Sequence, residues 1–336
     1  MDTVTHTLLG AAIGEAILGK RIGRKAMFYG ALTSNIPDID VLGILFLSDS
    51  KQLLFHRGIT HSIFFLLLIS ILLGWLTKFW IKDNRVNWKN WTILFLLTML
   101  SHLLLDSLTC YGLGIFEPFN NYRLSFNTIF VADPFYTLPL FIGVLLPFIG
   151  NRDSNAISKW NTIGLCISSS YLIFTFITHN YVLRVMKNSF NEQKLVSNDF
   201  TVTPTPLNTF LWMGFSNDKE GSWIGYYSIF DKEKKINYFR VQKNDSLLQP
   251  FENNESIKNL KQLSKGNYFI SKEDSILYFN DIRFGQVSGW NTADAPFAFK
   301  FNLNKNAENK RALNRIKYNE PTYEWFTTLV NRIKGK

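Results

Sequence analysis

The chain has 336 residues, a mean hydropathy of zero, and 36 lysines and arginines against 26 acidic residues. This length accommodates about two domains, and the zero mean hides a contrast, because residues 1–182 are dominated by long apolar runs whereas residues 183–336 are polar. The excess of basic residues forms no concentrated stripe, so nucleic-acid binding is not expected. We predict an α-helical membrane domain over residues 1–182 and a β-rich α+β extramembrane domain over residues 183–336.

Two short apolar segments, residues 5–18 and 25–36, open the chain. Small residues, which allow helices to approach closely, recur in both: Gly10, Ala11, Ala12, Gly14, Gly30 and Ala31. We therefore predict a hairpin of short helices packed against the membrane spans. The residues before it, Met1 to His6, include no basic n-region, so a cleavable signal peptide is not expected.

Longer apolar windows follow at residues 59–81, 91–110 and 160–182. Each approaches the ~20 residues that a helix needs to cross a bilayer, so we predict three membrane spans. A fourth window, residues 134–149, is shorter but nearly uninterrupted, and we expect it to span with its flanks. Amphipathic indole rings suit the headgroup region, and the tryptophans near the window ends are Trp75, Trp80, Trp88, Trp91 and Trp160.

The polar second half has a different pattern, in which short β-branched and aromatic runs alternate with Asn, Asp, Gly and Lys. This pattern predicts strands, at residues 222–230, 236–241, 275–279, 281–287 and 297–303. Residues 256–263 are compatible with a helix between them. Residues 321–333 carry apolar side chains at helical spacing and are predicted to form a C-terminal helix.

Four of the five histidines fall in three short motifs within the first 110 residues. The motifs are Thr5-His6-Thr7, His56-Arg57-Gly58-Ile59-Thr60-His61-Ser62 and Ser101-His102-Leu103-Leu104-Leu105-Asp106, and Asn35-Ile36-Pro37-Asp38-Ile39-Asp40 lies between the first two. Imidazole nitrogens and carboxylate oxygens suit zinc, manganese or iron. His102 and Asp106 are four residues apart, so they share one face of a helix.

Each motif alone has an ordinary explanation. A single histidine at a helix end more often forms a hydrogen bond than binds a metal, and Asp38 and Asp40 would ordinarily be turn residues after Pro37. Asp106 is different because a carboxylate inside an apolar span costs at least a few kcal/mol unless it is paired or hydrated. An ionisable pair there indicates a functional site.

Topology gives the strongest argument for a shared site. If the apolar segments alternate in direction, all of these side chains lie at the same side of the membrane. The predicted metal ligands are His6, Asp38, Asp40, His56, His61, His102 and Asp106. Asp133, just before the fourth window, joins them on that side. The fifth histidine, His179, is expected to be an interfacial residue.

The side of the membrane follows from the basic residues. The connections opposite the cluster are rich in Lys and Arg, for example over residues 20–25 and 82–89. The positive-inside rule then puts the cluster and the C-terminal domain outside the cytoplasm. Arg184, Lys187 and Lys194, just after the last span, argue for the opposite orientation.

The motifs resemble those of the YdjM-like family of inner-membrane proteins, described as LexA-binding proteins or metal-dependent hydrolases. The resemblance covers roughly residues 1–180 and rests on four elements in order. They are Asp2-Thr3-Val4-Thr5-His6-Thr7, Pro37-Asp38-Ile39-Asp40, the run from His56 to Ser62, and His102 with Asp106. The resemblance implies a bacterial inner-membrane protein with a metal-dependent hydrolytic activity.

At a greater distance, His102 and Asp106 resemble the His-x-x-x-Asp ligand pair of zinc-dependent phospholipase C and the P1-type nucleases. This resemblance implies zinc and a phosphoester substrate. Those enzymes also use a processed N-terminal amine and further His or Glu ligands that this sequence does not show. The resemblance therefore does not extend to a trinuclear centre.

The preferred hypothesis is hydrolysis of a phospholipid or another lipid-linked phosphoester, assisted by a divalent metal, with zinc ahead of manganese and iron. Arg57 would donate to the phosphate or form an ion pair with Asp40 or Asp133, and one of these two carboxylates could act as the base. The expected partners are membrane lipids and a lipid-derived substrate. The alternative is a membrane-anchored binding module with a structural metal site. A transporter is disfavoured because the polar residues gather at one end of the spans.

Overall fold

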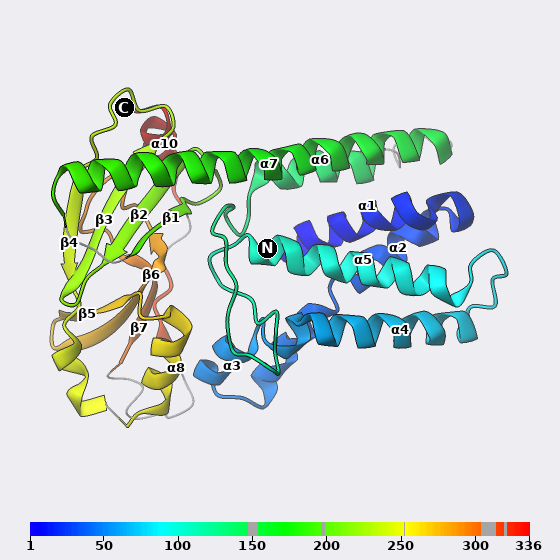
Figure 1. Ribbon diagram of the computed structural model, residues 1–336, viewed down its shortest axis with the longest axis horizontal. Coiled ribbons are helices and arrows are strands. Elements are labelled where there is room, and N and C mark those ends of the chain that lie inside the picture. The colour runs from blue at the N-terminus through cyan, green and yellow to red at the C-terminus, as the bar shows by residue number, and fades with distance from the viewer. Residues whose placement is uncertain (147–153, 196–198, 252, 304–313, 319–320) are drawn as a thin grey trace. The chain divides into compact units, whose positions relative to one another are not determined.

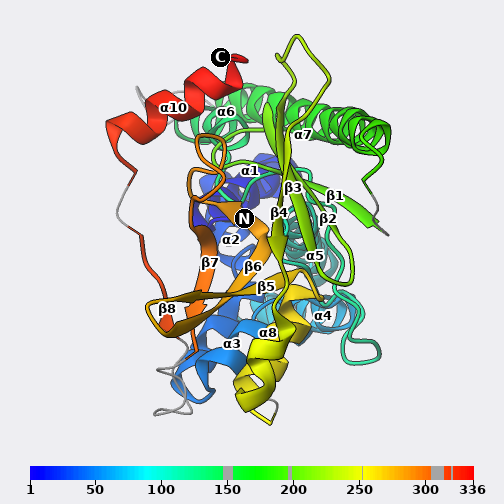
Figure 2. The ribbon, with the colours of Figure 1, turned by 90° about the vertical axis from the view of Figure 1, so that its left-hand side faces the viewer.

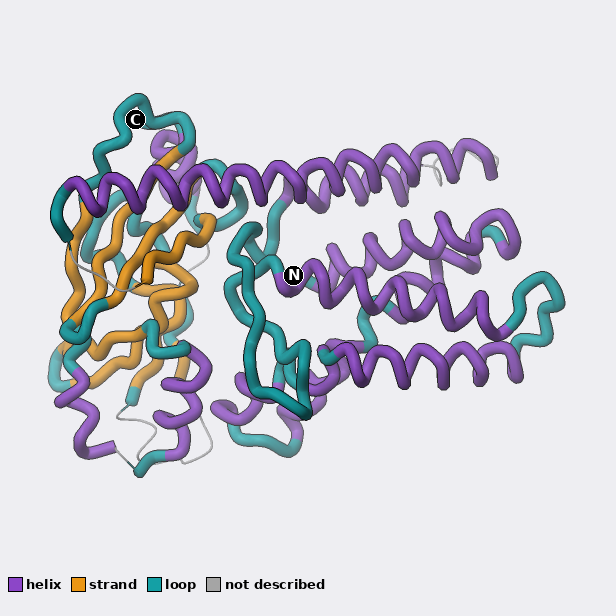
Figure 3. The backbone as a smooth tube through the Cα atoms, viewed as in Figure 1, coloured by secondary structure: helices purple, strands orange, loops and turns teal. Residues whose placement is uncertain are grey.

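The computed structural model describes residues 1–146, 154–195, 199–251, 253–303, 314–318 and 321–336. These residues form two compact units. The first contains Met1–Leu42 and Phe55–Thr175, and the second contains Gly43–Leu54 and Phe176–Lys336. Within the described residues, the named strands all belong to the second unit, as the colouring of Figure 3 shows.

Helices α1 (Thr3–Ile22) and α2 (Arg24–Thr33) form a tight hairpin at the start of the first unit. Asp2 caps α1 by accepting a hydrogen bond from the Thr5 backbone nitrogen. The two backbones approach so closely that a Cβ on Gly30 would clash with the carbonyl oxygen of Gly10. Small residues therefore permit this packing, which places the start of α1 beside the end of α2.

Helices α4 (Ile63–Trp80) and α5 (Trp88–Ser107) pack against each other, and α5 also packs against the N-terminal hairpin (Figure 1). Both are long and apolar enough to cross a membrane, as is Asn155–Glu192 of α7 (Ser154–Glu192). Only 17% of the α4 window is buried, compared with 56% of the α5 window. α5 is therefore the central helix, whereas α4 presents a wide apolar face to its surroundings.

The prediction of four long spans is wrong for the described residues, in which three helices meet the length and hydropathy needed. The fourth window forms α6 (Pro134–Leu145), a helix of 12 residues with Pro139 inside it. Residues 147–149 of that window lie outside the described residues. A helix of 12 residues rises only ~18 Å, which is less than the hydrocarbon thickness.

Three short elements connect α2 to α4. They are the 3-10 helix η1 (Pro37–Leu45), helix α3 (Asp49–Phe55) and the 3-10 turn η2 (Ile59–His61). Ser62 ends this connection and caps α4 by accepting from the Phe65 backbone nitrogen. The connection therefore leads into the N-terminal end of α4. It carries five of the predicted site residues.

Two antiparallel four-stranded sheets dominate the second unit (Figure 2). The first contains β1 (Asp199–Pro204), β2 (Leu211–Asn217), β3 (Gly221–Ser228) and β4 (Tyr238–Gln242). The second contains β5 (Tyr268–Glu273), β6 (Ile276–Gln286), β7 (Phe297–Asn302) and β8 (Asn314–Arg315). Among the described residues after β4, the helices are η4 (Asp245–Phe251), α8 (Glu255–Ser264) and the C-terminal α10 (Tyr323–Ile333). Strands β1, β2, β5 and β8 lie outside the predicted strand ranges.

The first sheet has an aromatic core. Trp212 and Tyr227 are almost fully buried and pack with Met186 from the last part of α7. His179 precedes Met186 on the same helix, α7. Its ring lies edge-on to that of Trp212, with 5.7 Å between the ring centroids. The fifth histidine is half-buried and therefore lies against this core, not in the cluster formed by the other four.

Candidate metal centre

The predicted ligands converge at one end of the helical unit. His6 comes from the first turn of α1, and Asp38 and Asp40 come from η1. His61 is the last residue of η2, whereas His102 and Asp106 face the same point from the last two turns of α5. Helix alternation explains this convergence, because each motif occupies the corresponding end of its segment.

Four ligand atoms form the centre of the cluster. His61 Nε2 lies 3.3 Å from His102 Nε2 and 3.3 Å from Asp38 Oδ1, and His102 Nε2 lies 3.6 Å from the same Asp38 oxygen. Asp106 Oδ2 is 3.7 Å from His102 Nε2 and 3.8 Å from His61 Nε2. Zinc bonds of about 2.0–2.1 Å in a tetrahedron separate ligand atoms by roughly 3.3 Å. Asp38, His61 and His102 therefore match three corners of a zinc site, and Asp106 lies beside both histidines.

Hydrogen bonds hold both central imidazoles in a ligand orientation. His102 Nδ1 lies 2.7 Å from the Ser34 carbonyl oxygen. A carbonyl only accepts, so Nδ1 of His102 carries the proton and Nε2 presents its lone pair to the cluster. On the other ring, His61 Nδ1 lies 3.2 Å from Asp40 Oδ2 and 3.1 Å from Thr60 Oγ1. Asp40 thus orients His61 as carboxylates commonly orient metal-binding histidines.

Asp40 is surrounded by donors. Its oxygens accept from the Arg57 backbone nitrogen at 2.9 Å and the Thr60 hydroxyl at 2.9 Å, and they lie 2.8 Å from His56 Nδ1. Burial raises the pKa of Asp40, but hydrogen bonds with His56 and His61 outweigh burial and hold the pKa well below its ordinary value. Asp40 is therefore ionised and fully engaged, which favours an orienting role over the predicted role of base.

His6 extends the cluster on the α5 side. Its ring stacks on that of His102 with 3.6 Å between centroids, and its Nε2 lies 3.2 Å from Asp106 Oδ1. The Met1 α-amino group donates to the same Asp106 oxygen. His6 Nδ1 is buried without a hydrogen-bond partner in the described part of the chain. The two ring nitrogens thus differ, because Nε2 faces the Asp106 carboxylate whereas Nδ1 is a buried nitrogen that lacks a hydrogen bond.

Three overlapping groups of potential ligands result. Within each group the ligand atoms lie within 4.8 Å of one another. The groups are His6, His102 and Asp106, then Asp38, His61 and His102, and finally Asp38, Asp40 and His56. His102 belongs to the first two groups but has a single free lone pair, on Nε2, so these two groups are alternative sites for one ion.

Arg57 is buried beside the cluster and has an unusual backbone, with φ of 64°. Its Nε lies 3.0 Å from Asp106 Oδ2, and its Nη1 donates to the Thr109 hydroxyl at 2.8 Å. The guanidinium also lies 4.5 Å from the ring centroid of Tyr111. The ion pair considered for Arg57 therefore exists, but its partner is Asp106 and not Asp40 or Asp133.

Asp133 lies apart from the three ligand groups. It caps α6 by accepting from the Phe135 backbone nitrogen at 2.9 Å, and its other oxygen accepts from the Tyr171 hydroxyl at 2.9 Å. Burial raises its pKa to about 6, although these hydrogen bonds lower it. Helix capping therefore explains why this carboxylate is buried. The role of Asp133 as a base stays a prediction, because these contacts do not connect it with the cluster.

The Asp133→Asn variant should be more stable than the wild type above pH 7, and the difference should vanish near pH 3. An acid whose pKa is raised in the folded state destabilises folding as pH rises from 3.8 to about 6, and the full penalty persists above that range. The penalty is at most roughly 3 kcal/mol, and asparagine still caps a helix. Thermal unfolding in detergent against pH measures this effect. A stability difference between the two proteins that does not change with pH contradicts it.

Glu117 is a residue that the sequence analysis missed. Its carboxylate lies against Gly58, where a Cβ would sit 2.9 Å from Glu117 Oε2. Burial raises the pKa of Glu117, although Arg123 and His61 lower it. No apolar periodicity marked this position, because Glu117 lies in the connection after α5. Only the fold brings it beside the His56 to His61 motif.

This fold and cluster define a multi-pass helical membrane protein with a candidate divalent-metal centre. A sequence model of the YdjM inner membrane protein family matches residues 1–183, and the chain belongs to this family. The inner membrane protein YbcI of Escherichia coli (strain K12) is 31% identical over 112 residues, which make up 33% of this chain and 63% of YbcI. No solved structure matches the chain. Family membership and the apolar helices together place the protein in the inner membrane.

Proposed function

We propose that the protein is a membrane-bound, metal-dependent hydrolase that cleaves a phospholipid or another lipid-linked phosphoester. The observation that carries this proposal is that the Nε2 atoms of His61 and His102 lie 3.3 Å apart and 3.3–3.8 Å from carboxylate oxygens of Asp38 and Asp106. When bound, zinc or a similar ion supplies a Lewis acid for the phosphoryl oxygen and acidifies water. His6 and His56 are the further potential ligands.

Other residues of the chain would admit the substrate, stabilise negative charge and accept a proton. The Asp38 side chain is 22% exposed, whereas those of His61, His102 and Asp106 are buried, so substrate approaches from the Asp38 side. The buried charge of Arg57 stabilises negative charge on the phosphoryl oxygens. Glu117, whose carboxylate lies beside Gly58 of the His56 to His61 motif, is the proposed acceptor of the proton that the attacking water releases.

Hydrolysis is tested by presenting the zinc-loaded protein with short-chain phospholipids in mixed micelles and measuring the released phosphorylated headgroup or phosphate. We expect turnover by the wild type and at least a tenfold loss in Asp38→Asn, which removes a ligand on the open side. The Asp83→Asn variant, whose carboxylate pairs with Arg85 in the connection between α4 and α5, is the matched carboxylate control and should keep wild-type turnover. A zinc-loaded wild type that hydrolyses neither phospholipids nor simple phosphodiesters contradicts the proposal.

The site and the β-rich unit are proposed to lie on the extracytoplasmic side, as the distribution of basic residues indicates. Tyr323 of α10 is 88% exposed and offers a reporter position. A cysteine at Tyr323, with Cys110 and Cys166 replaced, should react with a membrane-impermeant maleimide in spheroplasts. Reaction only after lysis puts the β-rich unit in the cytoplasm.

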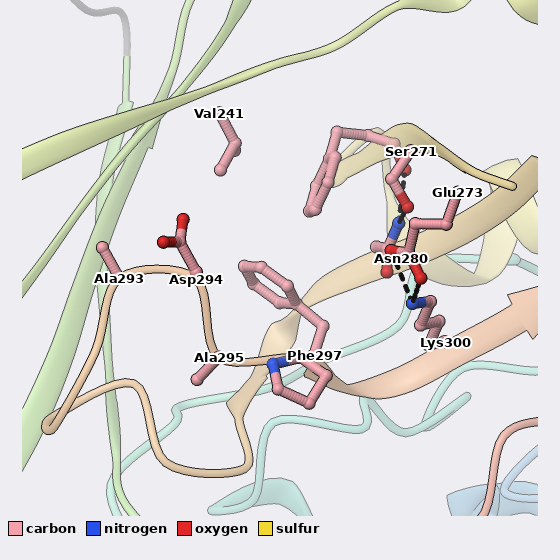
Figure 4. Close-up of a pocket in the computed structure, with 11 residues that line it drawn as sticks. Val241, Ser271, Glu273, Asn280, Ala293, Asp294, Ala295, Phe297 and Lys300 are labelled. Atoms are coloured by element: carbon pink, nitrogen blue, oxygen red, sulfur yellow. Dashed lines mark hydrogen bonds and ion pairs between the residues drawn. The ribbon is translucent and has the colours of Figure 1, made fainter.

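A binding module is the second candidate function, and a cavity of about 390 Å³ in the β-rich unit favours it (Figure 4). Val241, Phe269 and Phe297 form its apolar part. On one side Lys300 Nζ pairs with Glu273 at 2.6 Å, and the exposed Asp294 lies on the other. An apolar body with a charged end would fit this lining.

The two functions are separated by complementation of a deletion strain. A hydrolase predicts that His61→Ala with His102→Ala abolishes complementation, whereas Phe297→Ala with Phe269→Ala preserves it if the protein still folds. A binding module predicts the reverse. Detergent-solubilised protein yield for each variant controls for folding.

A further inference from the structure

The loop from Tyr111 to Asp133, which joins α5 to α6, has an exposed surface without charge. Its charged residues are Glu117, Arg123 and Asp133, and each is at least partly buried. The exposed positions are Phe116, Pro118, Phe119, Asn120, Asn121, Tyr122 and Phe126. A loop that faces water is normally polar or charged, so a surface of this composition marks an interface.

Three large aromatic rings dominate this surface. Phe116 is 52% exposed, Phe119 is 79% exposed and Tyr122 is 58% exposed. Phenylalanine and tyrosine rings with neighbouring asparagines match the region between hydrocarbon and water, where amphipathic aromatic residues concentrate. We call Phe116, Phe119 and Tyr122 the aromatic rim.

The rim is held in place by backbone hydrogen bonds. Leu113 and Leu124 bond each other in both directions at 2.9 Å, which closes the loop below the rim. The Gly114 backbone nitrogen donates to the Arg57 carbonyl at 2.8 Å, and Arg123 Nη2 donates to the His56 carbonyl at 2.8 Å. The rim is therefore fixed to the same segment that carries the metal-site residues His56 and Arg57.

The rim continues the outer face of a membrane-spanning helix. The Phe119 ring lies edge-on to that of Phe64, with 5.6 Å between centroids, and Phe64 is the second residue of α4. The outward residues of α4 that follow are all apolar and 45–56% exposed: Leu67, Leu68, Ile71 and Leu72. A span of this composition faces hydrocarbon, so lipid reaches the rim without crossing a charged surface.

We propose that the aromatic rim inserts into the interfacial region of the bilayer and holds the metal centre at the depth of the lipid headgroups. The occupant is the lipid itself, because the surface is continuous with a lipid-facing helix. The rim's position in the bilayer is independent of catalysis. Its consequence, that a headgroup enters the site from the leaflet, rests on the proposed hydrolase function.

Site-directed spin labelling tests the depth of the rim without an activity assay. Cys110 and Cys166 are replaced, and a nitroxide is placed on a cysteine at Phe119 or Tyr122 in the full chain, reconstituted in phosphatidylethanolamine and phosphatidylglycerol vesicles. Collision with oxygen, which partitions into lipid, is compared with collision with a water-soluble nickel chelate. A cysteine at Leu68 gives the lipid reference, and a cysteine at Tyr323, which is 88% exposed, gives the water reference.

We expect the ratio of oxygen to nickel collisions at Phe119 and Tyr122 to lie between the two references and several-fold above that of Tyr323. A ratio equal to that of Tyr323 overturns the proposal because the rim then faces water. An immobile label shielded from both reagents also overturns it, because a protein surface then covers the rim. Because both failures leave the hydrolysis assay unchanged, they are distinguishable from failure of the proposed function.

Discussion

Asp106→Ala is expected to lose bound metal and to be destabilised by about 3–5 kcal/mol. Asp106 is completely buried and lies 3.0 Å from Arg57 Nε and 3.2 Å from His6 Nε2. Removing one partner of a buried ion pair leaves the other charge uncompensated, which has a cost of this size. Thermal unfolding in detergent and elemental mass spectrometry measure the two losses separately.

The double variant Asp106→Ala, Arg57→Asn separates stability from metal binding. Asparagine is chosen because residue 57 has φ of 64°, a conformation that asparagine tolerates. We expect the second substitution to restore part of the stability, because the buried Arg57 charge is then gone while the Met1 α-amino group still lacks its Asp106 partner, but not to restore the metal. Recovery of metal binding in the double variant would show that Asp106 is not a ligand.

Asp40→Asn is expected to lower metal affinity about 10–100-fold without abolishing binding. Asp40 contacts His61 Nδ1 at 3.2 Å and so fixes that ring from behind, and residues in this position typically contribute such a factor. Asp38→Asn is the matched control, because Asp38 Oδ1 lies 3.3 Å from His61 Nε2 at the centre of the cluster. The loss of metal affinity in Asp38→Asn should be larger than that in Asp40→Asn.

Competition between the protein and a zinc chelator of known affinity measures both variants. A larger loss in Asp40→Asn than in Asp38→Asn would make Asp40 a direct ligand. In that case His56, which forms one ligand group with Asp38 and Asp40, would become a candidate ligand of the same ion. An unchanged affinity in Asp40→Asn would mean that His61 needs no orienting carboxylate.

The meeting of distant motifs could be predicted from segment alternation. His6, His61 and His102 each stand at the end of an apolar segment, and helices that reverse direction bring alternate ends together. The close hairpin was also predictable, because glycine and alanine recur where α1 and α2 touch. Both predictions depend on periodicity and residue size, which are local properties of the chain.

Other features depend on contacts that no local pattern encodes. The partner of Arg57 is set by the turn at residue 57, and the acceptor of His102 is a backbone carbonyl, that of Ser34. Asp133 begins a helix beside Tyr171, so its burial is explained by capping. Hydropathy alone overestimated the length of the fourth helix. The apolar window does not reveal that this helix has only 12 residues and contains Pro139.

The most direct test of the account is the metal content of the detergent-purified protein, measured by elemental mass spectrometry. The wild type is compared with the double variant His61→Ala, His102→Ala, whose fold is checked by circular dichroism. We expect about one or more equivalents of zinc, manganese or iron per wild-type chain and none in the still-folded variant. A wild type that binds no metal, even after reconstitution with these ions, contradicts the account.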